Sequence, residues 1–154
     1  MSDQKNDKIL EVKNLKVSYH TYAGEVKSVR GVSFDLKEGE AIAIVGESGC
    51  GKSVTAKSIM GLIKGPQGEI KQGSEILYHG DNILNYNKKQ WQAYKGGEVA
   101  IIFQDALASL NPTMRVGKQI MENLMAHKHM TKDEANAIAI ITRCLIPPEN
   151  SCGY

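Results

Sequence analysis

The chain has 154 residues, and its 19 Lys and Arg nearly balance its 17 Asp and Glu, which leaves a formal charge of +2. This balance gives no indication of a nucleic-acid partner. Hydrophobic residues make up 42% and charged residues 23%, which is ordinary for a globular domain with a core. The apolar runs reach only about five residues, far short of a membrane span, and the polar tail 1–8 lacks a secretory signal.

Apolar side chains interleaved with charges predict a first strand, interrupted near Asn14, and a second strand after the turn at Gly24. The third strand is apolar throughout, as a strand covered by helices on both faces must be. The predicted strands are 9–19, 26–36, 41–45, 74–78 and 99–103.

Helical spacing of apolar residues predicts helices over 52–63, 87–94 and 116–125. Thr131 and Glu134 form a capping-box signature that begins another helix. We expect Ile138, Ile141 and Leu145 on its buried side, and Pro147 stops it.

The segment between the third strand and the first helix has the pattern G-x-x-x-x-G-K-S. It consists of Gly46, Glu47, Ser48, Gly49, Cys50, Gly51, Lys52 and Ser53. Such a loop wraps backbone N–H groups around nucleotide phosphates, and the helix behind it adds its positive end. Lys52 is then expected at the β- and γ-phosphates and Ser53 at Mg²⁺, with Val54 next to them. The alternative is a glycine-rich turn without a ligand.

Three cysteines, Cys50, Cys144 and Cys152, without CxxC spacing argue against a disulfide framework or a zinc site. For Cys50, we favour tolerance of a small side chain over a redox role. The pair His127 and His129 is interpreted as a solvated helix end, because no third metal ligand is near.

Residues 29–36, Glu38-Gly39-Glu40 and the loop together resemble the start of an ABC transporter ATPase subunit. The stretch 101–112, which ends in Ser109-Leu110-Asn111-Pro112, resembles the Q-loop of the oligopeptide and dipeptide importer branch, with Ala106 where many relatives have Pro. The resemblance covers about residues 8 to 142. It implies an α/β fold of the P-loop (RecA-like) type: an incomplete nucleotide-binding domain with an N-terminal antiparallel β part and the start of a helical subdomain.

The resemblance also implies roles for single residues. Tyr19 matches the aromatic residue that stacks on adenine, with Tyr22 as the second choice, and an ordinary strand-end aromatic as the alternative for Tyr19. Gln104 matches the residue that reaches Mg²⁺ and the attacking water, so Lys52 and Gln104 are the expected catalytic residues. Residues from Asp105 to Arg115 would face a transmembrane permease subunit, and a second ATPase subunit would complete the ATP site.

The implied parts are a polar tail over 1–8, a nucleotide-binding core over 9–103, the Q-loop and start of the helical subdomain over 104–146, and an irregular tail over 147–154. The sequence contains no LSGGQ-type signature, no Walker B strand that ends in Asp-Glu and no switch histidine. We therefore expect a truncated, marginally folded chain that binds Mg-ATP weakly and does not hydrolyse it. Without its neighbours, 41–45 would be left with an open apolar edge.

The function expected of the intact parent is ATP-driven peptide import, at the inner face of the cell membrane. Alternatives are an inactive remnant that only binds nucleotide or a permease, and a small P-loop kinase or GTPase. The last would need a lid arginine cluster or an Asn-Lys-x-Asp motif, and neither is present. An ABC protein that acts on nucleic acid fits the near-neutral charge less well.

Overall fold

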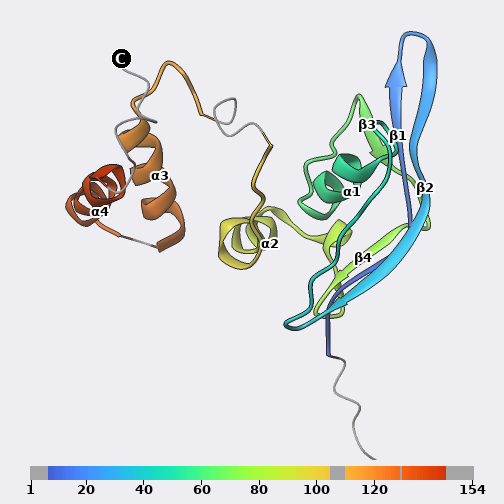
Figure 1. Ribbon diagram of the computed structural model, residues 1–154, viewed down its shortest axis with the longest axis horizontal. Coiled ribbons are helices and arrows are strands. Elements are labelled where there is room, and N and C mark those ends of the chain that lie inside the picture. Colours follow the sequence, from blue (N-terminus) through green and yellow to red (C-terminus); the bar gives the residue numbers. More distant parts are fainter. Residues whose placement is uncertain (1–6, 105–109, 129, 145–154) are drawn as a thin grey trace, which may run out of the picture. The chain divides into compact units, whose positions relative to one another are not determined.

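The computed structural model describes residues 7–104, 110–128 and 130–144 (Figure 1). The chain forms two units, residues 1–99 and residues 100–154. The first unit contains the sheet and the phosphate-type loop, and the second contains a pair of helices.

Two long antiparallel strands, β1 (Lys8–Thr21) and β2 (Gly24–Lys37), form the larger part of the sheet. β4 (Glu75–Tyr78) pairs with the first half of β1, β3 (Gly68–Ile70) pairs with its second half, and β5 (Asp81–Asn82) pairs with β4. The strand order is β2-β1-β4-β5, with β3 beside β1; Figure 1 labels the four longer of these strands. The strands predicted at 9–19, 26–36 and 74–78 are confirmed, whereas β3 and β5 were not predicted.

The predicted interruption near Asn14 is a β-bulge. Asn14 has a φ of 48°, a conformation that asparagine tolerates well, and the pairing register with β2 shifts between Val12 and Leu15. Because of the extra residue in the bulge, Val12 and Leu15 face the same side of the sheet although they are three positions apart. Both side chains lie in the core, Val12 1% exposed and Leu15 0%. Among the described residues, the buried side chains that form the hydrophobic core are Val12, Leu15, Val17, Val29, Ile76, Ile83 and Tyr94.

The helix that follows the loop, α1 (Lys52–Ile59), is shorter than the predicted 52–63. Gly61 has a φ of +58°, and two backbone bonds close the helix end, from Gly61 N–H to the Ser58 carbonyl (2.9 Å) and from Leu62 N–H to the Lys57 carbonyl (2.9 Å). This is a Schellman termination with glycine in the left-handed position. Gly61 is therefore the residue that ends the helix, and the prediction that it continues to 63 was wrong.

The helix predicted at 87–94 is confirmed as α2 (Lys88–Ala93), with a capping box between Asn87 and Gln90. The short helix η1 (Ile83–Asn85) precedes it and η2 (Tyr94–Glu98) follows it. Tyr94 is 2% exposed, and its hydroxyl donates to the Ile59 carbonyl at the end of α1 (3.2 Å). Burial raises the pKa of this hydroxyl to about 12.

Two predicted strands are absent from the structure. Residues 41–45 form no strand, and Ile44 and Val45 are 45% and 90% exposed. Of residues 99–103, only Val99 takes part in a bridge, with Lys95, and Ile102 is 95% exposed. Both predictions were wrong for the same reason: a strand needs a neighbouring strand to pair with, and among the described residues no strand pairs with either segment.

The second unit contains α3 (Val116–Lys128) and α4 (Lys132–Cys144), which pack on each other. Both helices were predicted, and the capping box of Thr131 and Glu134 is present, with Thr131 N–H donating to Glu134 Oε2 (2.9 Å). The predicted buried side of α4 was wrong in part. Ala135 and Ala139 are buried, whereas Ile141 is 61% exposed, and Leu145 and Pro147 lie outside the described residues. No helix in the described ranges has the length and apolarity to cross a membrane.

Candidate functional site: a phosphate-type loop

The loop at 46–53 makes a backbone path that depends on glycine. Gly51 caps the N-terminus of α1 with a φ of 95°, and a Cβ atom there would lie 2.6 Å from the Ser28 carbonyl oxygen of β2. A side chain is therefore excluded on two grounds, the left-handed backbone and the contact with β2. Gly49 also has a positive φ, of 82°. The loop thus lies against the sheet at β2.

Lys52 folds back into the loop. Its Nζ atom donates to the carbonyl oxygens of Gly46 (2.7 Å) and Glu47 (2.6 Å) and lies 3.6 Å from the Cys50 thiol. The ammonium group is thus held within the loop by backbone carbonyls, at the place where an anion enclosed by the loop would meet it. Four of the predicted site residues, Gly46, Glu47, Cys50 and Lys52, therefore lie together in the structure, while their contacts with a nucleotide stay predictions.

The first turn of α1 presents the helix N-terminus to the loop. No acidic residue lies in this turn, so nothing in it offsets the partial positive charge that favours an anion. Ser53 is exposed there, Val54 packs partly against the core, and Thr55 turns its hydroxyl back to the Gly51 carbonyl (3.0 Å). Glu47 and Ser48 are exposed.

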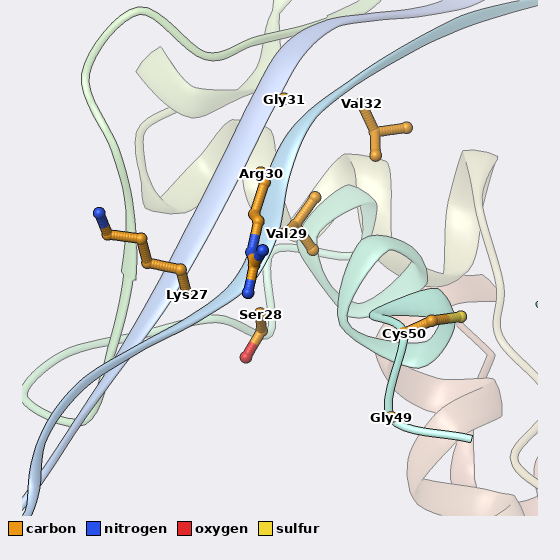
Figure 2. Close-up of a pocket in the computed structure, with 8 residues that line it drawn as sticks. All are labelled: Lys27, Ser28, Val29, Arg30, Gly31, Val32, Gly49 and Cys50. Carbon is orange, nitrogen blue, oxygen red and sulfur yellow. The ribbon is translucent and has the colours of Figure 1, made fainter. Parts of the chain in front are cut away.

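A pocket of about 440 Å³ adjoins the loop (Figure 2). Gly49 and Cys50 line it from the loop, and six consecutive residues of β2 line it from the sheet, 27–32. Two of these are the cations Lys27 and Arg30, both exposed. No motif in the sequence marks them as site residues, because single basic residues in a strand carry none. Only the folded chain shows that β2 forms one wall of the pocket beside the loop.

The two candidate base-stacking residues differ in their surroundings. Tyr19 lies on β1 opposite Val26 of β2 and Gly68 of β3, and it is half-buried against the core. Tyr22 lies at the β1–β2 turn and is fully exposed. The Tyr19 side chain thus packs against the core, whereas the Tyr22 side chain is surrounded by solvent.

Gln104 belongs to the second unit and is exposed. The residues 105–109 of the predicted permease-facing stretch lie outside the described residues. The rest of that stretch is held by Gln119 of α3, whose side chain accepts from Asn111 N–H (3.0 Å) and donates to the Met114 carbonyl (3.0 Å). Gln119 was not predicted to have this role.

The predicted Mg²⁺ ligand from the loop is Ser53. Its exposed hydroxyl in the first turn of the helix suits an ion that takes one protein oxygen together with phosphate oxygens and water. Among the described residues, no group of three or more His, Cys, Asp or Glu could hold a metal by itself.

Comparison with known proteins adds three close relatives. The chain is 51% identical over 144 residues to the dipeptide transport ATP-binding protein DppD of Lactococcus lactis subsp. cremoris, covering 92% of this chain and 41% of that protein. It is 50% identical to the oligopeptide transport ATP-binding protein OppD of Bacillus subtilis (86% and 37% covered) and 44% identical to OppD of Escherichia coli (88% and 39%). The chain spans about two-fifths of the length of these relatives.

The sequence profile of the ABC transporter family matches residues 29–149. The match includes β2 from Val29 onward, the loop, α1, α2 and the two helices of the second unit. The predicted fold class agrees with this match and with the observed antiparallel sheet followed by helices. On the strength of this profile and of the loop geometry, the chain belongs to the ABC transporter family.

Proposed function

We propose that this chain binds Mg-ATP through the loop 46–53, as part of the ATP-binding subunit of a peptide importer. The observation that carries the proposal is the position of Lys52, whose ammonium group is held by the carbonyls of Gly46 and Glu47 at the N-terminus of α1. A positive group, a helix N-terminus and a glycine-based backbone converge there, and this combination suits a polyphosphate.

In this proposal the backbone N–H groups of 46–51 enclose the phosphates and Lys52 moves from the carbonyls to the β- and γ-phosphate oxygens. Ser53 supplies a hydroxyl to Mg²⁺, which neutralises phosphate charge when bound. Tyr19 stacks on the base, with Tyr22 as the alternative. Gln104, by the family resemblance, is the residue that reaches Mg²⁺ and the attacking water in the intact parent.

The importer assignment is supported by the names of the relatives, which are dipeptide and oligopeptide transport ATP-binding proteins. By that likeness, the stretch from Asp105 to Arg115 contacts a transmembrane permease at the inner face of the membrane. A second ATPase subunit completes the site. The fixing of Asn111 and Met114 by Gln119 supports a preformed contact surface at the described end of this stretch.

We further propose that these 154 residues bind ATP without turning it over. ATP hydrolysis in this family uses a Walker B acid and a signature sequence, and neither motif is present in the chain. The described site supplies groups that bind phosphate, and no carboxylate is among the contacts of Lys52. An inactive remnant that still occupies a permease is the related alternative.

The test is Mg-ATP binding by calorimetry and phosphate release by the purified 154-residue chain. Lys52→Ala should weaken ATP binding by about 10- to 100-fold, because it removes charge-assisted bonds to phosphate. Lys57→Ala is the matched control, because Lys57 is an exposed lysine on the same helix at its other end, and it should leave binding unchanged.

Equal losses in the two variants, or no binding by the unaltered chain, would refute the assignment of the loop. Phosphate release that disappears in Lys52→Ala would refute the proposal of binding without turnover, because it would require an acid that supplies the catalytic role within these residues. ATP-dependent capture of the chain by a peptide permease in membrane vesicles would support the importer assignment.

A further inference from the structure

Tyr19 is connected to the phosphate-type loop through the sheet. It lies on β1 opposite Val26 of β2, and two residues further along β2 the backbone of Ser28 meets the loop at Gly51. The position of the Tyr19 ring relative to the loop is therefore determined by the pairing of β1 and β2 and by whatever contacts the ring on its other side.

The neighbour on that other side is Gly68 of β3, which pairs directly with Tyr19. Gly68 is buried, and a Cβ atom on it would lie 3.1 Å from Tyr19 Cε1 and 3.5 Å from Cδ1. One edge of the tyrosine ring thus rests on bare glycine backbone, an arrangement in which an aromatic side chain covers a glycine across a strand pair.

The same Cβ atom would also lie 3.1 Å from Ile63 Cγ2, and Ile63 packs partly against the core just beyond α1. A methyl group at position 68 would therefore require the tyrosine ring and the Ile63 side chain to move by a few tenths of an ångström. Gly68 differs in this respect from Gly97, around which nothing lies within 4 Å of the corresponding position.

Charged residues fix β3 in place beside β1 and β2. Lys71 Nζ lies 2.7 Å from Glu69 Oε2 and 2.9 Å from Glu25 Oε1, and His20 lies 2.9 Å from the same oxygen of Glu69. The backbone adds a bond from His20 N–H to the Gln67 carbonyl (2.8 Å). The glycine under the ring is thus held from both flanks.

We propose that Gly68 is a positioning residue for base stacking: its missing side chain sets the tilt of the Tyr19 ring so that the ring meets the base while the loop 46–53 holds the phosphates. This inference rests on the proposed function, because it requires a nucleotide in the loop. Gly68 acts through Tyr19 and makes no contact with the nucleotide itself.

The experiment compares ATP with inorganic tripolyphosphate, both with Mg²⁺, by calorimetry on the full chain. Gly68→Ala should weaken ATP binding by about 3- to 10-fold and Tyr19→Ala by about 10-fold or more, because stacking on the base is lost in part or entirely. Tripolyphosphate has no base, so its affinity should stay unchanged in both variants. Gly97→Ala is the control and should change neither affinity.

The double variant Tyr19→Ala with Gly68→Ala should bind ATP as Tyr19→Ala does, because Gly68 has nothing to position once the ring is gone. An additive loss in the double variant would overturn the inference, and so would an equal loss of ATP and tripolyphosphate affinity in Gly68→Ala, which indicates general damage to the fold. If Lys52→Ala binds tripolyphosphate as tightly as the unaltered chain does, the proposed function is refuted. The inference about Gly68, which rests on it, is then refuted as well.

Discussion

Two segments of the first unit that the sequence predicts as strands, β1 and residues 41–45, differ in outcome. β1 contributes Val12, Leu15 and Val17 to the core, each at most 1% exposed, whereas residues 41–45 form no strand and are exposed throughout. β1 has hydrogen-bonded neighbours on both edges, and within the described residues 41–45 has none. Apolar, β-branched composition alone therefore does not make a buried strand; a paired edge is also needed.

The sharpest test of this comparison is a pair of truncations. Leu15→Ala should lower the free energy of unfolding by about 2–5 kcal/mol, because it leaves a cavity in a fully buried place. Ile44→Ala should change it by less than about 0.5 kcal/mol, because that side chain is 45% exposed. Urea unfolding followed by circular dichroism measures both. Similar costs for the two variants would show that 41–45 is packed in solution.

The end of α1 offers a second comparison, between a crowded glycine and an open one. A Cβ atom at Gly61 would lie 2.3 Å from the ring of Trp91, and the φ of +58° disfavours any side chain. Gly61→Ala should therefore cost about 2–3 kcal/mol of unfolding free energy. Gly97→Ala, with open space around it, is the matched control in thermal unfolding. A neutral Gly61→Ala would mean that α1 does not end as described.

The smallest effect concerns Tyr94, which links the core to α1. Tyr94→Phe removes the bond to the Ile59 carbonyl and should cost about 1 kcal/mol at neutral pH. An unfolded tyrosine titrates near pH 10, and the folded pKa of Tyr94 is raised to about 12. The neutral form is thus favoured by folding, so this contribution is complete below about pH 10 and declines as the pH rises toward about 12.

The difference in unfolding free energy between the unaltered chain and Tyr94→Phe isolates this titration from those of the other tyrosines. It should shrink between about pH 10 and about 12. A difference that stays constant over this interval would indicate that Tyr94 is not buried as described.

The sequence predicted those parts of the fold that depend on local patterns. Alternation predicted β1 and β2, helical spacing predicted α2, and a capping box predicted the start of α4. An interruption of β1 near Asn14 was also predicted, and the structure shows it as a bulge at which Asn14 takes a left-handed backbone. The predictions failed where a strand depends on pairing with another strand. Residues 41–45 and 99–103 have no strand beside them in the described part of the chain, and β3, which was not predicted, is a strand through its pairing with β1.

The same division applies to the candidate site. The pattern of glycines and Lys52 predicted the loop, because a phosphate-binding backbone imposes its own local residue order. Two features of the site could not be predicted, the pocket lining contributed by β2 and the contact between Tyr19 and Gly68. Both involve residues that are distant in the sequence and carry no motif. The roles of Tyr19, Lys52, Ser53 and Gln104 toward a nucleotide stay predictions until binding is measured.

The contact between Trp91 and Gly61 has a practical consequence. The chain has a single tryptophan, and its ring lies at one end of α1, whose other end carries Lys52. Lys95 is placed over the same ring, 4.7 Å from its centroid. The indole emission of the unlabelled protein therefore originates at one defined point, on α2 and beside the C-terminal end of α1. A shift of that helix upon ligand entry could be followed optically, without attaching a dye.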